Sequence, residues 1–329
     1  MAKLQSTEIV GVANRPATIC TDTVCMWFDT INRRPVFSYC ILSVDATTWS
    51  SGGALINARY NTTGTGTQNE GLILGGLSNA SISFTEEYGG ASWTAGGPLT
   101  TARWGLASAG TQNLGLGFGG FTNVNLSCSE EYNGLSWSAG GALITARREF
   151  AGAGTQNLGL ALGGKTNFQV SCTEEYGGAS WTAGGALITA RCGLAGAGTQ
   201  NSALAVGGTY SSINGLYRCT EVYNGGTWST GGSLIFARTS LMGFGTQNEG
   251  LVSGGNVKSY LYSSSVLCTE EYNGSLWISG GIMITARSSG GGAGTQNAGL
   301  VMGGNATGPP GVSCTEEYNT GVILIDSIE

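Results

Sequence analysis

Residues 154–191 read GTQNLGLALGGKTNFQVSCTEEYGGASWTAGGALITAR, and variants of this stretch recur along the chain. The tetrapeptide GTQN occurs six times, at spacings of 44, 44, 44, 47 and 49 residues. Each copy continues with a Gly-Gly pair and a Glu-x-Tyr segment, and the first five add a tryptophan and an Ala-Arg pair. Self-similarity at such a period is typical of repeat architectures. The copies begin at Gly66, Gly110, Gly154, Gly198, Gly245 and Gly294.

Each repeat divides into four short β-compatible segments that are separated by Gly, Asn and Ser turns. The first follows the Ala-Arg pair and ends at GTQN, and the second is the apolar run before Gly-Gly. The third contains the Glu-x-Tyr segment and the fourth contains the tryptophan. Glycines interrupt every helical pattern. Four strands in about 45 residues, repeated in this way, predict an all-β fold: a six-bladed β-propeller with four strands per blade.

The two ends of the repeat array complement each other. The sixth copy has Tyr318 but no tryptophan after it, whereas Trp49 stands ahead of the first copy. We therefore expect an N-terminal strand to complete the last blade and close the ring, which removes an open sheet edge. The predicted domains are an arm over 1–43, a propeller over 44–320 and a tail over 321–329. The predicted blades are 54–97, 98–141, 142–185, 186–232, 233–281, and 282–320 with 44–53.

The composition excludes several functions. Of 329 residues, 58 are glycine, 10% are charged and none is histidine, and the net charge is −6. Without histidine there is no Ser-His-Asp triad and no His-ligated metal, so we expect neither a metal nor a cofactor. An acidic chain with three lysines predicts no nucleic-acid binding. The N-terminal residues lack the apolar run of a signal peptide, and no stretch is long and apolar enough for a transmembrane helix.

Five of the nine cysteines occupy one position of the repeat, four residues before the tyrosine, where the first copy has Phe84. A position that accepts Cys or Phe predicts a small apolar core site. One cysteine per blade cannot easily reach its counterpart, so these thiols are expected to be free. A disulfide among Cys20, Cys25 and Cys40 stays open. The five repeat cysteines are Cys128, Cys172, Cys219, Cys268 and Cys314.

These motifs resemble the kelch repeat, which combines an arginine, an apolar strand ending in Gly-Gly, a Glu-x-Tyr segment and a tryptophan. The resemblance covers about residues 44–320, although the gap from tyrosine to tryptophan is shorter here. The particular repeat sequence, TEEYNGxSWxxGG with AGAGTQN, is similar to kelch-like repeats of marine phage and virus-derived proteins. Residues 26–37, MWFDTINRRPVF, are similar to a hairpin found near the start of tail-fibre-type virion proteins.

The repeated glutamates and arginines admit a structural and a catalytic interpretation. Paired carboxylates are typical of glycosidases. Six glutamates, each two residues before the tyrosine, match six arginines of the Ala-Arg pairs, and a buried carboxylate needs such a partner. We therefore predict structural ion pairs that fasten strands, because an active site is one place rather than six. The residues are Arg59, Arg103, Arg147, Arg191, Arg238 and Arg287 with Glu86, Glu130, Glu174, Glu221, Glu270 and Glu316.

Length variation is confined to one loop type. Between Gly-Gly and the Cys/Phe position lie 7, 7, 7, 10, 12 and 9 residues, so all insertions fall between the second and third strands. Insertions on one face of a repeat protein often mark its binding face. The loops 209–218 and 256–267 combine tyrosines with cations, which suits recognition of protein or glycan. The candidate binding residues are Tyr210, Tyr217, Arg218, Lys258, Tyr260 and Tyr262.

These observations favour a non-enzymatic structural protein of a virus particle, such as a tail fibre, knob or decoration subunit. It is expected to assemble in the host cytoplasm and to contact other virion proteins, or further copies of itself, through 1–43 or the loop face. A host-surface glycan or protein is the other expected partner. One alternative is an intracellular kelch adaptor that binds a protein partner. Another is a metal-free, glycan-active propeller enzyme, although kelch oxidases hold copper with histidine and no sialidase-type box is present.

Overall fold

The computed structural model describes residues 5–6, 19–21, 24–29, 34–38, 42–211, 215–258, 263–306 and 311–323. For those before residue 47, and for Ser211, Lys258, Ser263 and 321–323, it gives the strand backbone only. The chain divides into two units, Trp49–Asn319 and the combination of Met1–Thr48 with Thr320–Glu329. Each is described by itself. The described residues include no helix that is long and apolar enough to cross a membrane.

The N-terminal unit contains a three-stranded antiparallel sheet of β2 (Ile19–Thr21), β3 (Val24–Asp29) and β4 (Arg34–Ser38). The predicted hairpin over 26–37 corresponds to β3 and β4, which pair with Asp29 opposite Arg34. The short strand β1 (Gln5–Ser6) pairs with β5 (Leu42–Ser51). The cysteine side chains of this unit lie outside the described part of the chain, so the disulfide question is not addressed.

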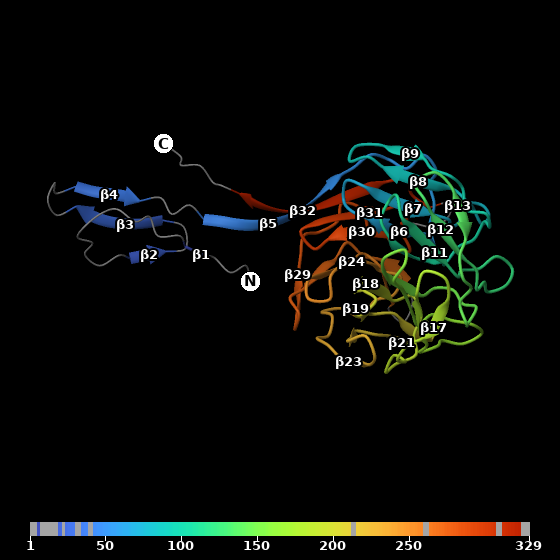
Figure 1. Ribbon diagram of the computed structural model, residues 1–329. Helices are drawn as coiled ribbons and strands as arrows, with labels where there is room; N and C mark the ends of the chain where they lie inside the picture. The colour runs from blue at the N-terminus through green and yellow to red at the C-terminus, as the bar shows by residue number, and fades with distance from the viewer. Residues whose placement is uncertain are drawn as a thin grey trace. The chain divides into compact units, whose positions relative to one another are not determined.

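The second unit is a β-propeller of six four-stranded blades, which confirms the predicted fold (Figure 1). Within the first five blades the strands pair antiparallel in chain order. Blade one consists of β6 (Thr63–Gly66), β7 (Gly71–Leu74), β8 (Thr85–Tyr88) and β9 (Trp93–Ala95). Blade two consists of β10 (Ala107–Gly110), β11 (Gly115–Phe118), β12 (Ser129–Tyr132) and β13 (Trp137–Ala139). Blade three consists of β14 (Ala151–Gly154), β15 (Gly159–Leu162), β16 (Thr173–Tyr176) and β17 (Trp181–Ala183). Blade four is β18 (Ala195–Thr199), β19 (Ser202–Val206), β22 (Thr220–Tyr223), β23 (Trp228–Thr230); blade five is β24 (Met242–Gly245), β25 (Gly250–Ser253), β28 (Thr269–Tyr272), β29 (Trp277–Ser279).

The sixth blade is formed from both ends of the repeat array. It contains β30 (Gly291–Thr295), β31 (Ala298–Met302) and β32 (Thr315–Ile323), and β5 pairs with β32 as its fourth strand. The ring of Trp49, on β5, packs 4.9 Å from that of Tyr318, as in the other blades. The predicted closure by an N-terminal strand is therefore confirmed. It gives the last blade the same four strands as the other blades.

The first strands of the six blades surround the central axis, where little space is available. Neighbouring first strands contact one another around the whole ring, from β6 through β30 and back to β6. These strands are rich in Gly and Ala because larger side chains do not fit there. A Cβ atom at Gly152, for example, would lie 2.3 Å from the carbonyl oxygen of Ser108 in the preceding blade. The alternation of Ala and Gly before GTQN is thus a packing requirement of the axis.

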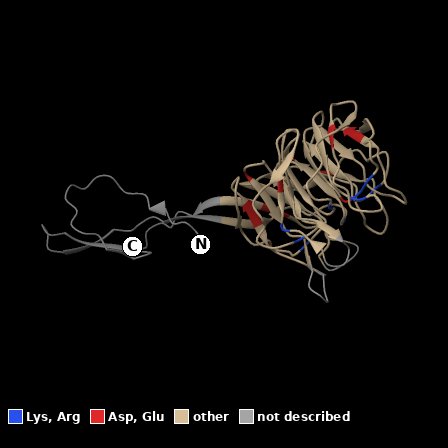
Figure 2. Cartoon of the chain, turned by 90° about the horizontal axis from the view of Figure 1, so that it is seen from below, with Lys and Arg blue, Asp and Glu red and all other residues tan. Residues whose placement is uncertain are grey.

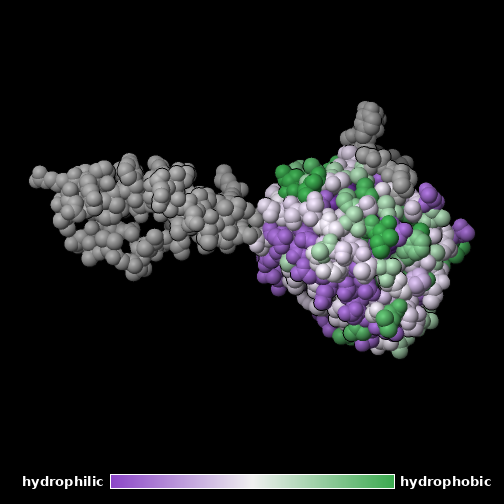
Figure 3. All heavy atoms as spheres, turned by 90° about the horizontal axis from the view of Figure 1, so that it is seen from above, coloured by the Kyte–Doolittle hydropathy of each residue, from purple (hydrophilic) through white to green (hydrophobic). Residues whose placement is uncertain are grey.

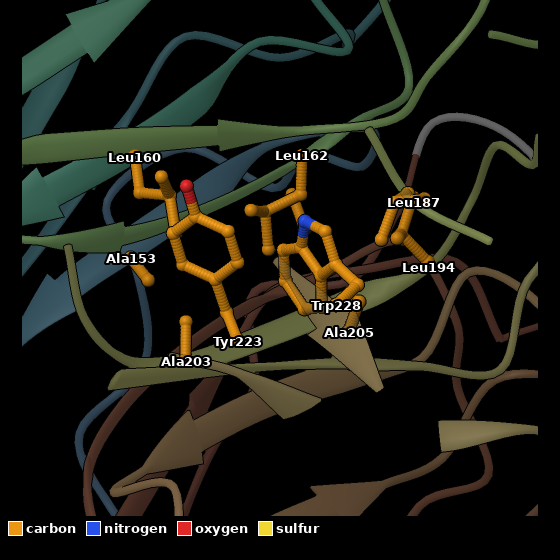
Figure 4. Packing of buried hydrophobic residues seen from close by; sticks show 10 residues of the cluster. Ala153, Leu160, Leu162, Leu187, Leu194, Ala203, Ala205, Tyr223 and Trp228 are labelled. Atoms are coloured by element: carbon orange, nitrogen blue, oxygen red, sulfur yellow. The ribbon is translucent and has the colours of Figure 1, made fainter. Parts of the chain in front are cut away.

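Apolar packing between blades uses the tyrosine and tryptophan of every repeat. Tyr223 and Trp228 of blade four pack with Leu160 and Leu162 of blade three, and all four are buried (Figure 4). The indole nitrogen of Trp228 donates to the hydroxyl of Thr173 in blade three at 3.0 Å. Each aromatic ring therefore supplies both apolar area and a satisfied polar group to the contact between blades. The equivalent donors are Trp49, Trp93, Trp137, Trp181 and Trp277.

The glutamine of GTQN also joins neighbouring blades. The side-chain amide of Gln200 donates to the carbonyl of Gly159 at 3.1 Å and to that of Tyr176 at 2.7 Å, both in the preceding blade. Gln68 of blade one makes the same bonds to Gly299 and Tyr318 of blade six, which completes the circle. GTQN is therefore more than the polar turn that its composition indicates. The other members are Gln112, Gln156, Gln247 and Gln296.

The repeated arginines and glutamates form buried ion pairs within each blade. The guanidinium of Arg103 lies 2.9 Å from the carboxylate of Glu130, and the two side chains are 0% and 3% exposed. The glutamate also accepts a backbone N–H from the connection between blades, here that of Thr100 at 2.6 Å. Each pair thus fastens the connecting segment to the third strand. The other pairs are Arg59–Glu86, Arg147–Glu174, Arg191–Glu221, Arg238–Glu270 and Arg287–Glu316.

The cysteine position differs from the sequence expectation. Phe84 is 46% exposed, and the five repeat cysteines are half-buried rather than in the core. The reason is that this residue lies just outside the third strand, where its carbonyl accepts a bond from the buried arginine. The Arg103 guanidinium, for example, donates to the carbonyl of Cys128 at 3.0 Å. The carbonyl therefore makes the bond that the Phe84 copy shares with the cysteine copies, and in blades two, three and four the thiol accepts a second bond from the same arginine.

Tyrosine hydroxyls form a further set of bonds between blades. The hydroxyl of Tyr132 donates to the Glu87 carboxylate of the preceding blade at 2.5 Å. Burial, together with this bond, raises the pKa of Tyr132 to about 12. Tyr88 and Tyr223 are in the same environment, and the pKa of each is also raised to about 12, mainly by burial.

These tyrosines predict a loss of stability at alkaline pH. The folded state holds the tyrosine proton more tightly than the unfolded state, whose tyrosines ionise near pH ~10. Their contribution is therefore complete below about pH 10 and falls as the pH rises towards about 12. We expect the free energy of unfolding, measured in urea at successive pH values, to decrease over this window. Tyr132→Phe should reduce the slope. Tyr210→Phe, at a side chain that is 52% exposed, is the control and should leave it unchanged.

The ion pairs predict a second effect. Arg191→Met should lower the free energy of unfolding by about 3–5 kcal/mol, because Glu221 is left buried without its cation. Arg218→Met, at an exposed arginine, is the control and should change it by less than about 1 kcal/mol. Chemical denaturation measures both. A loss below about 0.5 kcal/mol for Arg191→Met would show that the buried pair contributes little.

Candidate functional site at the loop face

The antiparallel order of the strands gives the propeller two different faces. We call the side that bears the loops between second and third strands and the connections between blades the loop face. The other side, which bears the GTQN turns and the tyrosine–tryptophan turns, is the hairpin face. The hairpin face repeats nearly unchanged around the ring, since its glutamines hold neighbouring blades together. The loop face differs from blade to blade and is where a particular ligand is best recognised.

Six residues in the left-handed conformation surround the axis at the loop face. Each precedes the first strand of its blade, and φ is 49° at Asn61, 61° at Gly105 and 54° at Glu149. Their backbones form a ring, in which the Gly105 N–H donates to the Asn61 carbonyl and the Glu149 N–H to the Gly105 carbonyl, both at 2.8 Å. The ring continues through Gly193, Ser240 and Ser289. This conformation is strained for a residue with a long side chain such as glutamate.

A cavity of about 130 Å³ lies on the axis inside this ring. All six blades contribute to its wall. Its lining is more polar than apolar, and it includes the ring of left-handed residues, among them Glu149. Glu149 is therefore the one acidic residue among the described residues in the wall of this cavity.

The predicted binding residues of blade four are brought together by the structure. Tyr210, on β20 (Thr209–Ser211), packs 5.1 Å from Tyr217, which follows β21 (Gly215–Leu216). Tyr210 is 52% exposed and Tyr217 is half-buried. Burial raises the pKa of the Tyr217 hydroxyl. Arg218 is exposed, although its Nε donates to the Leu234 carbonyl at 2.7 Å.

The predicted residues of blade five are only partly placed. Lys258 ends β26 (Asn256–Lys258), which pairs with β27 (Ser263–Ser265) as a second inserted hairpin on the loop face. Tyr260 and Tyr262 lie outside the described residues. The structure therefore assigns a position to the backbone of Lys258 and leaves the two tyrosines as predictions.

Sequence reasoning missed a cluster of charged side chains in blade three. The ammonium group of Lys165 lies 2.7 Å from a carboxylate oxygen of Glu149, and the Nε of Arg148 lies 3.7 Å from the same oxygen. The three side chains are 26%, 28% and 21% exposed, respectively. A signal was present: the residues after Ala-Arg and after Gly-Gly are charged in this copy alone. Comparison of the copies position by position would have found it.

Charge is unevenly divided between the two faces. Apart from the six buried arginines, the cations whose side chains are described in the propeller are Arg148, Lys165 and Arg218, all on the loop face. On the hairpin face Glu70 and Glu249 follow GTQN turns and are exposed. Figure 2 shows how few charged residues the fold displays. The positive charge of the described propeller surface therefore lies on the loop face.

Exposed apolar side chains are spread over the propeller rather than joined. Figure 3 shows separate apolar patches surrounded by weakly polar surface. Leu135 on the hairpin face and Phe168 on the loop face are 82% and 78% exposed. Among the described residues, no group of three or more Cys, Asp or Glu side chains lies close enough together to hold a metal ion.

The fold and these faces define the class of protein as a six-bladed β-propeller. The structure is similar to one reported as "Structure of YjhT", with a TM-score of 0.70. The alignment covers 80% of this chain and 95% of YjhT, with 13% identical residues, so the likeness concerns the fold alone. No protein-family model matches the sequence, and no curated protein matches it either.

The strained backbone at Glu149 predicts an unusual stability effect. Glu149→Gly should leave the free energy of unfolding unchanged or raise it by up to about 1 kcal/mol, because glycine adopts this φ without strain. The lost ion pair with Lys165 is partly exposed and contributes less than about 1 kcal/mol. The matched control is Gly105→Ala, in which a Cβ meets no atom closer than 3.5 Å. It should lose about 1 kcal/mol from backbone strain alone. A marked loss for Glu149→Gly, measured by urea unfolding, would contradict this interpretation.

Proposed function

We propose that this protein is a non-enzymatic binding protein that uses the loop face of its propeller to hold one ligand. The observation that carries the proposal is the concentration of cations, inserted hairpins and aromatic side chains on this face. Tyr210, Tyr217 and Arg218 lie together in one blade, and Arg148 with Lys165 in the blade before it. Aromatic and cationic side chains of this kind commonly provide most of the affinity at an interface.

We further propose that the protein is a structural component of a virus particle, such as a tail fibre, knob or decoration subunit. This proposal is supported by the resemblance of the repeat sequence to the kelch-like repeats of virus-derived proteins, together with the hairpin over 26–37. Under this proposal residues 1–43 or the loop face contact other virion proteins or further copies of the chain. The loop face is the part that engages a host-surface glycan or protein.

The carboxylates support binding rather than glycoside hydrolysis. Glu149 is the only Asp or Glu in the described loops and connections of the loop face. Hydrolysis by the usual glycosidase mechanism needs two carboxylates about 5–10 Å apart. The carboxylates of the strands are engaged elsewhere, in ion pairs such as Arg103–Glu130 and in bonds such as that of Tyr132 to Glu87. This arrangement suits a site that holds its ligand without cleaving it.

Purified particles test the virion proposal directly. Mass spectrometry of particles from a host that produces this chain should detect it, and immunogold labelling should place it on their surface. For the loop face, Tyr210→Ser with Arg218→Ser should weaken host attachment by at least tenfold, since hot-spot residues contribute about 2 kcal/mol or more each. Glu249→Gln, on the hairpin face, is the matched control and should attach normally. Particles that lack the protein would refute the virion role. Normal attachment of the double variant would refute the assignment of this part of the face.

A further inference from the structure

Two positions of each repeat lie next to each other on the loop face. One follows the buried arginine and the other follows the Gly-Gly pair, and the two are joined by a β-bridge. In blade two both residues are aromatic, and in blade three both are cationic, so two neighbouring blades together depart from the pattern of the others. The pairs are Tyr60 with Leu77, Trp104 with Phe121, Arg148 with Lys165, Cys192 with Thr209, Thr239 with Asn256, and Ser288 with Asn305.

The aromatic pair of blade two holds the guanidinium of blade three. The Arg148 Cζ lies 4.3 Å from the centroid of the Phe121 ring and 5.9 Å from that of Trp104. The two rings are 5.2 Å apart at an angle of 58°. An Nη of Arg148 donates to the amide oxygen of Asn125 at 2.5 Å. The guanidinium is thus fixed beside a half-buried indole, and its position does not depend on a ligand.

The cluster has an excess of positive charge. Arg148 and Lys165 share the single carboxylate of Glu149, which leaves a formal charge of +1. About a quarter of each side chain is exposed, 21%, 26% and 28%, so a ligand reaches these groups while solvent screens them less than on an open surface. The side-chain amides of Asn125 and Gln169 lie on the same two blades and continue the bridges. They provide donors and acceptors for hydroxyl groups.

The strained backbone at Glu149 points to the same place. Its equivalents in the other blades are glycine, serine or asparagine, whereas a glutamate in the left-handed conformation is disfavoured. Strained residues of this kind cluster at functional sites, where the function of the side chain offsets the energetic cost of the strain. Here the strained backbone directs the carboxylate to the ammonium group of Lys165, 2.7 Å away. It thereby fixes the Glu149 carboxylate and the Lys165 ammonium group relative to each other, beside the cavity on the axis.

We propose that Trp104, Phe121, Arg148, Glu149 and Lys165 form a binding site for an acidic sugar, a saccharide residue that carries a carboxylate or a sulfate group. The anionic group pairs with Arg148 and Lys165 in charge-assisted hydrogen bonds. The apolar face of the sugar ring lies on the indole of Trp104, and its hydroxyls bond to Glu149 and the amides. The inference rests on the proposed function, since it names the class of ligand that the loop face holds.

Charge and aromatic character together select this ligand. A neutral sugar would leave the excess positive charge unused. A polyanion such as nucleic acid requires many cations along a track, whereas this site offers one net charge on a chain whose net charge is −6. An acidic sugar matches both the single charge and the size of the aromatic surface.

Titration of the intact chain with small probes tests the proposal. Methyl glucuronide represents the carboxylate, galactose 6-sulfate the sulfate, and methyl glucoside is the neutral control. We expect at least one acidic probe to bind at least tenfold more tightly than the neutral sugar, as measured by calorimetry and by the change in tryptophan fluorescence. Raised salt should weaken this binding. Equal affinity for all three probes, or no binding of either acidic probe, would overturn the proposal.

Variants locate the site. Arg148→Ala with Lys165→Ala should lower the affinity for the acidic probe at least tenfold, and Glu70→Gln, at an exposed residue of the hairpin face, should leave it unchanged. Trp104→Leu should weaken binding without a change of charge. If the double alanine variant fails to fold, Arg148→Gln and Lys165→Gln, made singly, provide the same comparison. Unchanged affinity in these variants would refute the assignment.

The outcomes separate this inference from the proposed function. Loss of acidic-sugar binding with normal presence on particles and normal attachment would support the site and refute its use in attachment. Loss of attachment in the loop-face variants, without any binding of acidic sugars by the parent chain, would refute the acidic-sugar site and leave the proposed function standing.

Discussion

The propeller depends on polar and apolar contacts that each blade makes with the blade before it. Three side chains of every repeat take part: the tryptophan donates to a hydroxyl, the glutamine to two carbonyls, and in five of the six contacts the tyrosine to a glutamate. A four-stranded sheet of this size is too small to be stable alone, so its faces need a neighbour on both sides. Closure of the ring by β5 gives every blade two neighbours and removes the edge at which the ring would open.

The same constraint explains the unequal faces. Gln112 and its equivalents tie the hairpin face to the contact between blades, and substitutions there would disturb every neighbour at once. The buried pairs such as Arg103–Glu130 hold the connecting segments but leave the tips of the long loops free. Sequence differences between the repeats are therefore concentrated at the loop face. They lie in the inserted hairpins β20–β21 and β26–β27 and in the residues around the cavity on the axis. A rigid ring with one variable face is well suited to present a ligand site.

Much of this architecture could be predicted from the repeat. Six copies of one strand pattern require six blades, and the displaced Trp49 requires closure of the ring by the N-terminal strand, because each copy must bury the same ring on the same partner. That each repeated arginine pairs with a repeated glutamate also follows, since a charge repeated at a core-facing position needs a counter-charge. The partner itself does not follow: Glu174 is the first candidate for Arg191 in the sequence, and the structure pairs Arg191 with Glu221 and Glu174 with Arg147. The prediction of an apolar core site for the cysteines was wrong because a side chain just beyond a strand has no fixed face, and there both the carbonyl and the thiol of Cys128 accept bonds from the Arg103 guanidinium.

The sequence by itself determined the strands, their number, the closure and the face that varies, because these depend on patterns that every copy repeats. Only the tertiary structure decided which of the residues that differ from the repeat pattern contact one another. Trp104 and Arg148 are 44 residues apart in the chain, and the ring places them on neighbouring blades with their side chains in contact. The left-handed backbone of Glu149 was likewise decided by the ring of N–H to carbonyl bonds around the axis, which no local sequence signal reveals. The physical reason is that contacts between blades join residues one repeat apart, and their chemistry depends on the pair rather than on either residue alone.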